Sequence, residues 1–213
     1  MIKKIVKYLK EDYNRKTIIF ALLSTLICLT YAIYNGYLGI TKLSLFHGSI
    51  CVYYLLLLGI RTMLLVSERR PKNGSNHQKP VIILSYTLLL LITVAMITPI
   101  MQLINDKREY NLGLIPAIAT AAYTTYSITM AIINMKKAKT NDNAYVKQIR
   151  LLNLIYSIMS VTVLQSTMIL ANGGYDGKMR TLSIYTSFAI ISIVAIIVIH
   201  SFISYIKELK VKK

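Results

Sequence analysis

Six apolar runs of membrane-spanning length divide this chain and leave little of it for anything else. Each has about 20 residues or more, the length at which a helix crosses about 30 Å of hydrocarbon. The expected spans cover residues 17–34, 47–66, 80–104, 112–135, 148–171 and 182–206. With 55% hydrophobic residues, 15% charged residues and a mean hydropathy of +0.54, the chain lies outside the range of soluble domains. The sequence predicts an all-α fold, a polytopic transmembrane bundle of six spans.

Three regions follow from this division. Residues 1–16 place apolar side chains at helical spacing opposite most of their lysines, a pattern typical of a basic amphipathic helix on an anionic membrane surface. A solvated basic leader fits the same residues. Residues 17–206 are expected to form the six-helix transmembrane domain, and residues 207–213 a basic cytoplasmic tail. The first run is too long for a signal-peptide core, so we expect it to stay as an anchor.

The basic residues indicate the topology. The N-terminal segment, the second and fourth connections, the C-terminal tail and Arg61 hold 20 of the 25 Lys and Arg residues. Cytoplasmic loops carry such an excess, and an even number of spans puts both termini on one side. We therefore expect a multi-pass protein of the bacterial plasma membrane with both termini cytoplasmic. The net charge of +17 then reflects topology, and the expected partner is the lipid bilayer, with no nucleic acid.

Residues that catalysis or metal binding would need are missing from the spans. All eight acidic residues lie in loops or tails, and the three histidines lie in separate segments. No metalloprotease, nucleophile-elbow or phosphate-loop motif is present. We expect no metal, no cofactor and no enzymatic activity; a lipid-modifying enzyme is the third-ranked alternative. Cys28 and Cys51 fit two inert thiols, and an interhelical disulfide is geometrically open to them.

The second span carries the sharpest polar pattern. His47, Tyr54, Arg61 and Glu68 recur every seven residues, which places them on one helix face with about 20° of drift per step. One interpretation is a polar stripe that lines a cavity. The other is separate anchoring, with Tyr54 packed in the bundle and Arg61 extended toward the cytoplasmic phosphates.

The fifth span repeats this pattern. Arg150 and Ser157 share one row, while Asn153, Ser160 and Thr167 share the next, about 60° away. Gln165 lies at the edge of this polar sector. A buried amide needs a hydrogen-bond partner, so it is expected to face a helix or water rather than lipid. Its role is either interhelical bonding or cavity lining.

The fourth span predicts a central helix. A small-residue row runs through Gly113, Ala117, Ala121 and Thr125, at the spacing that lets membrane helices approach closely. The adjacent row holds Ala119, Tyr123, Tyr126, Met130 and Asn134. We expect one face pressed against a partner and the next bearing two deep phenols. In the third span, Pro99 is expected to bend the helix locally.

Three stretches carry a resemblance: NGYLGITKLSLFHGSICVYYLLLLGIR, AAYTTYSITMAIINMKKAK and IRLLNLIYSIMSVTVLQSTM. They resemble the corresponding parts of an uncharacterised family of six-span membrane proteins of Gram-positive bacteria. The resemblance implies the six-span topology and no activity. Relatives often have a basic residue where this chain has Ser127, so a charge-dependent role at that position is not expected here.

Two functions fit these observations. The first is a small carrier, channel or membrane-embedded binding protein for an anionic or neutral polar solute or lipid head group. Its candidate cavity residues are His47, Tyr54, Arg61, Tyr123, Tyr126, Asn134, Arg150, Asn153, Ser157, Ser160 and Gln165. The second is a non-catalytic accessory or structural subunit, either a homo-oligomer or part of a membrane complex such as a multi-subunit transporter.

Overall fold

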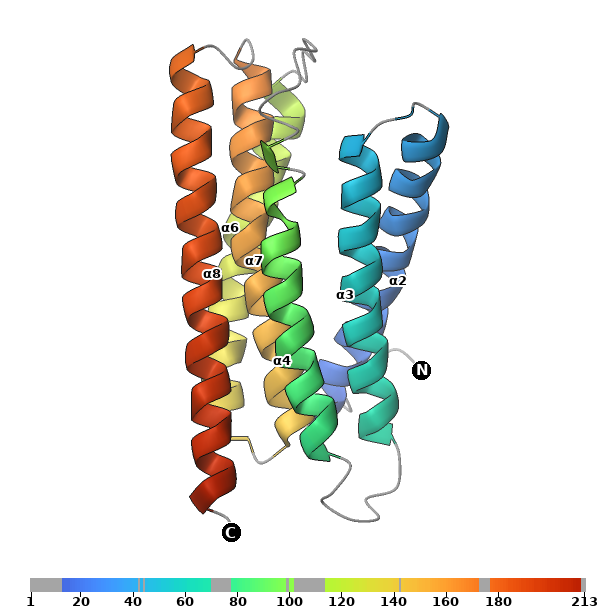
Figure 1. The fold of residues 1–213 in the computed structure, drawn as a ribbon, viewed down its shortest axis with the longest axis vertical. Helices are drawn as coiled ribbons and strands as arrows, with labels where there is room; N and C mark the ends of the chain where they lie inside the picture. Colours follow the sequence, from blue (N-terminus) through green and yellow to red (C-terminus); the bar gives the residue numbers. More distant parts are fainter. Residues whose placement is uncertain are drawn as a thin grey trace, which may run out of the picture.

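The computed structural model describes residues 13–41, 43, 45–69, 78–98, 100–101, 114–141, 143–172 and 177–211. These residues confirm the all-α prediction: long helices run up and down one bundle (Figure 1). The helices are α2 (Tyr13–Thr41), α3 (Leu45–Arg69), α4 (Gln78–Ala95), α6 (Leu114–Lys139), α7 (Ala144–Ala171) and α8 (Gly177–Val211). The amphipathic helix expected in residues 1–16 lies almost wholly outside the described residues.

Four helices are long and apolar enough to cross a membrane, namely α2, α3, α4 and α8. This composition supports a multi-pass membrane protein. The other two, α6 and α7, have the length of a span but carry more hydroxyl and amide side chains.

The third expected span is interrupted near its end. Helix α4 ends at Ala95, Met96 forms a turn, and residues 97–98 and 100–101 are helical again. The backbone nitrogen of Ile100 donates to the Met96 carbonyl at 3.4 Å. Ala95 lies four residues before Pro99, and a proline ring clashes with the carbonyl of the residue four positions earlier. The interruption therefore lies where Pro99 was predicted to bend the helix.

Helix α7 is the centre of the bundle. It packs against α2, α3, α4, α6 and α8, whereas the packing of α6 in the described residues is almost wholly against α7. The prediction that residues 112–135 form a central helix is therefore wrong. Small polar groups recur on both helices, and their spacing in the sequence does not say which helix has more neighbours.

The packed row of α6 also differs from the predicted one. Ala117, Thr124, Ala131 and Ala138 are its buried residues, at seven-residue spacing. A seven-residue row stays nearly parallel to the helix axis, whereas a row at i, i+4 drifts by about 40° per step. Thr125, from the predicted row, is consequently exposed.

Helices α2 and α3 form a tight hairpin. A Cβ placed on Gly39 would lie 3.1 Å from the backbone nitrogen of Gly48, so glycine at this position lets the two backbones approach closely. Near the same end, Asn35 Oδ1 lies 3.0 Å from His47 Nδ1, a hydrogen bond across the hairpin. His47 thus joins two helices at the rim.

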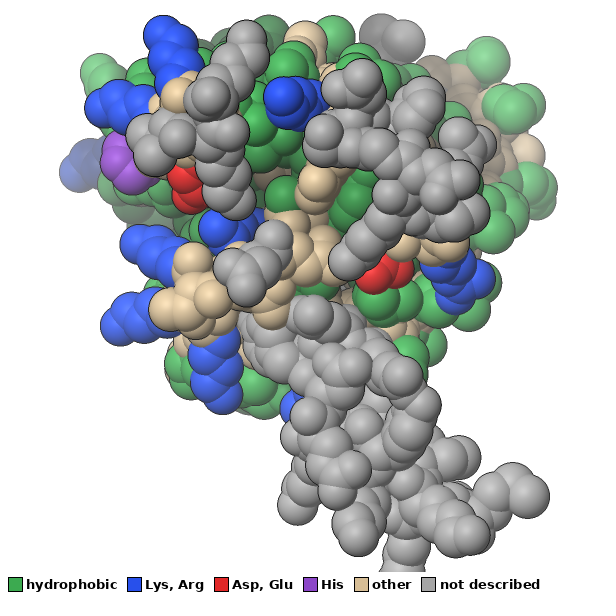
Figure 2. All heavy atoms as spheres, turned by 90° about the horizontal axis from the view of Figure 1, so that it is seen from below, with side chains coloured by type: hydrophobic (Ala, Val, Ile, Leu, Met, Phe, Trp, Pro, Cys, Tyr) green, Lys and Arg blue, Asp and Glu red, His purple; other side chains and the backbone are tan. Residues whose placement is uncertain are grey.

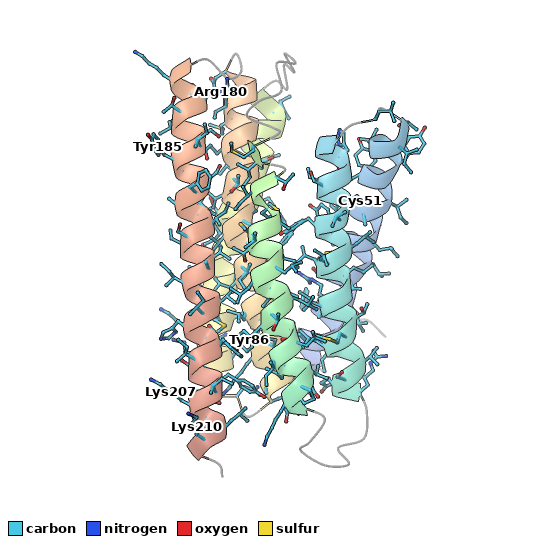
Figure 3. The ribbon with its side chains drawn as sticks, viewed as in Figure 1. Cys51, Tyr86, Arg180, Tyr185, Lys207 and Lys210 are labelled. Carbon is cyan, nitrogen blue, oxygen red and sulfur yellow. The ribbon has the colours of Figure 1, made fainter. Side chains whose placement is uncertain are left out.

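The two ends of the bundle differ in charge. The end where α3, α6 and α8 finish carries Lys136, Lys137 and Lys139 together with the basic residues at the end of α8 (Figure 2). Lys207 and Lys210 lie here, whereas Arg180 and Tyr185 lie at the opposite end (Figure 3). We call the end with Lys207 and Lys210 the basic end.

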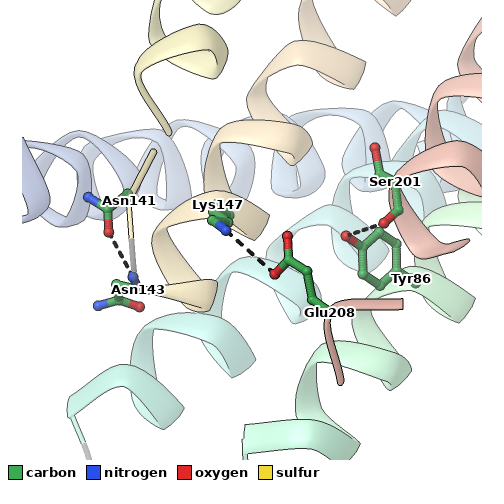
Figure 4. A network of polar contacts seen from close by, with 6 residues as sticks. All are labelled: Tyr86, Asn141, Asn143, Lys147, Ser201 and Glu208. Atoms are coloured by element: carbon green, nitrogen blue, oxygen red, sulfur yellow. Dashed lines mark hydrogen bonds and ion pairs between the residues drawn. The ribbon is translucent and has the colours of Figure 1, made fainter. Parts of the chain in front are cut away.

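Polar contacts tie the helices together at the basic end. Lys147 Nζ of α7 lies 3.6 Å from Glu208 Oε2 of α8, and the Tyr86 hydroxyl of α4 donates to the Ser201 carbonyl at 3.3 Å (Figure 4). Asn143 caps the start of α7 by accepting from the backbone of Tyr145 and Val146. Burial and the nearby Glu68 carboxylate both raise the pKa of Tyr145, so its phenol stays protonated.

Candidate functional site

Arg61 is a charged side chain enclosed by the bundle. It is 1% exposed, and its Nε and Nη1 atoms have no hydrogen-bond partner among the described residues. The alternative in which Arg61 extends along the lipid face to the membrane surface is therefore wrong. Enclosing a cation without partners costs several kcal/mol, so its presence needs an explanation beyond packing.

Tyrosines and one thiol surround the Arg61 guanidinium. Its Cζ lies 6.0 Å from the centroid of the Tyr156 ring of α7. The guanidinium also interacts electrostatically with Tyr53 of α3, Cys28 of α2 and Tyr123 of α6. Side chains from four helices thus lie near one cation, and a phenol whose single hydroxyl hydrogen is uncommitted can donate it to a ligand beside the guanidinium.

A second layer fixes the tyrosines. The Tyr54 hydroxyl is hydrogen-bonded to Tyr156. The Tyr54 ring stacks on Tyr31 of α2, with centroids 5.2 Å apart and planes 15° apart, and meets Tyr53 edge-on at 5.4 Å. These contacts hold the rings in place across α2, α3 and α7.

No carboxylate of the described chain neutralises Arg61. Glu68 and Glu208 are the acidic residues described, and Glu208 pairs with Lys147. Glu68 lies seven residues beyond Arg61 on α3 and accepts from Asn143 Nδ2 at 3.5 Å. Within the described part of the chain, no cluster of three His, Cys, Asp or Glu residues could hold a metal ion. The chemistry on offer is a cation with hydroxyl donors, which suits an anion.

The polar sector of α7 lies between two neighbouring helices. Ser157 Oγ and Ser127 Oγ of α6 are 2.7 Å apart, while Tyr156 faces α3. Helical-wheel arithmetic places Asn153 and Ser160 on the arc between Ser157 and Tyr156, about 40° and 60° from Ser157. Both are half-buried. They therefore face the seam between α6 and the α2–α3 hairpin, which we call the α6 seam.

On α6, the two expected deep phenols separate. Tyr123 and Tyr126 are 56% and 65% exposed, so neither is deep. Tyr126 lies about 160° around the helix from the buried row, and Tyr123 about 100° from it, on the side of Ser127. Tyr123 therefore borders the α6 seam, while Tyr126 faces outward.

Other candidate residues join helices away from Arg61. Arg150 Nη2 donates to Thr17 Oγ1 of α2 at 2.6 Å, and Gln165 Oε1 accepts from Thr186 Oγ1 of α8 at 2.6 Å. Ser160, by contrast, bonds within its own helix: its Oγ donates to the Ser157 carbonyl at 2.7 Å. Gln165 thus forms a hydrogen bond between α7 and α8, so of its two expected roles the structure shows interhelical bonding. Asn134 is half-buried further along α6, three residues past the buried Ala131.

Tyr54 and Arg61 thus both interact with Tyr156, and helical-wheel positions put Tyr123, Asn153 and Ser160 along the adjoining seam. Sequence reasoning missed Tyr53, Tyr156 and Cys28. Tyr156 could have been found, because it lies three residues from Asn153 and so borders the same polar sector. Both cysteines are free, and Cys28 is buried.

Comparison of the chain with protein-family models, curated proteins and solved structures finds no match. The resemblance to the Gram-positive six-span family therefore stays a prediction. Arg61 and the side chains around it, Cys28, Tyr53, Tyr54, Tyr123 and Tyr156, are called the Arg61 cluster below.

Proposed function

We propose that this protein is a small membrane-embedded binding protein or carrier for an anion, with Arg61 at its binding site. In this proposal all six helices cross the bacterial plasma membrane, and the basic end faces the cytoplasm with both termini. The alternation of six helices in one bundle supports the span count, and the excess of lysine at one end supports the orientation.

The orientation has a direct test. A cysteine placed at Lys137 should react with a membrane-impermeant maleimide only after cells are opened, whereas one at Lys178 should react in intact cells. Both residues are exposed, so each label reports its side of the membrane. The reverse pattern would overturn the proposed orientation.

The observation that carries the functional proposal is the enclosed Arg61 with two unpartnered nitrogens. A guanidinium offers a planar fork of donors that matches carboxylate and phosphate oxygens. The Tyr53 hydroxyl near it adds a neutral donor, whereas the Tyr156 hydroxyl is already hydrogen-bonded to Tyr54. A bound anion would supply the charge and the acceptors that the described chain does not provide.

An anion panel tests this proposal. Protein purified in neutral detergent is heated with carboxylates, phosphate monoesters and phosphate diesters, including lipid-linked ones. We expect at least one class to raise the unfolding temperature of the natural chain, because a ligand that binds only the folded state stabilises it. Arg61→Met should abolish the response. Arg69→Gln, at the exposed end of the same helix, is the matched control and should keep it. No response to any anion, or an equal response in Arg61→Met, would exclude the proposal.

A second candidate is a non-catalytic subunit of a membrane complex. It is favoured by the outward face of α6, where Tyr126 and Thr125 expose hydroxyl-bearing side chains at mid-height. Helices that meet in a membrane often bond through such groups. A stoichiometric partner recovered from native membranes, and lost on Tyr126→Leu, would support this candidate.

A further inference from the structure

We infer that the ligand is an anionic amphiphile, a carboxylate or phosphate head on a hydrocarbon chain, which enters sideways from the bilayer through the α6 seam. This inference rests on the proposed function and names the class of anion. Three observations lead to it: the reach of the Arg61 cluster, the packing of α6 against a single neighbour, and the height of the cluster in the bundle.

The Arg61 cluster reaches the outer surface of the bundle on two helices. Tyr123 of α6, although 56% exposed, interacts electrostatically with both Arg61 and Tyr156. Tyr31 of α2 is 47% exposed and stacks on Tyr54. The enclosed cation is therefore linked to the surface through Tyr123 on the α6 side, and through Tyr156, Tyr54 and Tyr31 on the α2 side.

Helix α6 is attached to the bundle through one neighbour. It packs closely along α7 through a row of small residues and the Ser127–Ser157 pair. Its packing in the described residues does not extend to α2, α3, α4 or α8 in any comparable measure. Helix α7, with half-buried Asn153 and Ser160, forms the floor of the seam. Because helix packing does not join α6 to the α2–α3 hairpin, this polar floor is a place for a ligand head group.

The height of the cluster decides what kind of anion can arrive by this route. Arg61 lies eight residues before the end of α3, about 12 Å from the basic end at 1.5 Å per residue. Tyr123 lies nine residues, about 13 Å, from the opposite end of α6. With the helices spanning a membrane, the α6 seam at Tyr123 faces acyl chains rather than water. A molecule that keeps its chain in the bilayer can insert its head there, whereas a chainless anion would have to cross hydrocarbon.

The surface beside the α6 seam is apolar, as contact with such a chain requires. Ala119 and Met130 share the Tyr123 side of α6 and are exposed, as is Ile27 on α2. Apolar side chains of this kind contact a hydrocarbon chain, while Arg61 and the phenols receive the head group. The cation then draws the amphiphile inward, and the chain limits how far it enters.

A tryptophan reporter tests this inference, because the natural chain contains no tryptophan. Tyr123→Trp places a fluorophore at the seam, and Tyr126→Trp places one on the outward face as the matched control. Each variant, in nanodiscs of zwitterionic lipid, is titrated with a chain-brominated fatty acid at about pH 9, where the carboxyl group is ionised. Bromine quenches tryptophan only on close approach.

We expect saturable quenching of Tyr123→Trp by the brominated acid, reversed by the unbrominated acid. Its methyl ester, and either compound with Tyr126→Trp, should give only the shallow rise of random collisions. Adding Arg61→Met should weaken the saturable binding at least about tenfold, since a hydrogen bond to a charged group contributes about 1.5–3 kcal/mol. Equal quenching by acid and ester, or saturable binding that survives Arg61→Met, would overturn the inference.

Thermal unfolding of the natural chain gives a second, independent measurement if Tyr123→Trp folds poorly. Stearate should raise the unfolding temperature and stearyl alcohol should not. Arg61-dependent stabilisation by chainless anions alone would refute the amphiphile and leave the proposed function standing. No Arg61-dependent response to any anion would refute both.

Discussion

At the scale of single residues, Arg150 bonds to Thr17 and Gln165 to Thr186, so each joins two helices. Thr124, Gln148 and Ser187 each have one buried polar atom without a partner among the described residues, but these side chains carry no charge. Arg61 is a fully buried cation, and its Nε and Nη1 have no partner there. Membrane proteins keep such residues where a substrate or ion passes or binds.

This difference predicts the effect of Arg61→Met on stability. Methionine has a similar length and no charge, so it removes the cost of burying an unpaired cation. Without ligand, we expect Arg61→Met to raise the free energy of unfolding by about 1 kcal/mol or more, measured by unfolding in mixed micelles. A loss of stability of that size would mean that Arg61 is a structural element of the fold.

The sequence anticipates some of these residues and not others. Seven-residue spacing links Tyr54 with Arg61 because both lie on one helix, and the structure brings them to one cluster. Tyr53, Tyr156 and Cys28 enter the cluster through contacts between helices, which spacing within one helix does not define. Tyr123 and Tyr126 are three residues apart, yet only Tyr123 borders the seam. Side-chain identity could not separate them.

At the scale of helices, hydropathy places the helices well and their ends less well. Helix α4 is interrupted at Met96, close to Pro99, while α8 continues at both ends beyond its apolar centre into basic residues. The helix with the most unusual composition, α6, proves peripheral, and α7 is central. Periodicity shows which faces of a helix differ, but the neighbour that each face meets depends on the whole bundle.

The close contact between α6 and α7 predicts a sensitive position. Ala131 is 7% exposed in the packed row, so Ala131→Leu should push α6 from α7 and cost about 1–3 kcal/mol. Ala122→Leu, on an exposed part of α6, should change stability little. Unfolding in mixed micelles compares the two variants. Equal stabilities would show that the Ala117–Ala138 row is not the contact surface.

At the scale of the whole molecule, the bundle combines a tight hairpin, a central helix and one outer helix that packs mainly on the central one. The α2–α3 hairpin and α7 hold the cation, and α6 borders the side from which a ligand reaches it. Lysines gather at one end (Figure 2), so the molecule offers positive charge both at its surface and inside. A carrier of anionic amphiphiles would use this combination to attract a head group and then to enclose it.

The most direct test of the central claim is an experimental structure of the protein with a bromine- or selenium-labelled anion, located by its anomalous scattering. We expect the heavy atom beside Arg61, with acceptor oxygens of the anion about 3 Å from Nε and Nη1 and the chain lying between α2 and α6. An Arg61 guanidinium paired with a carboxylate of the protein, and no anion beside it, would contradict the account.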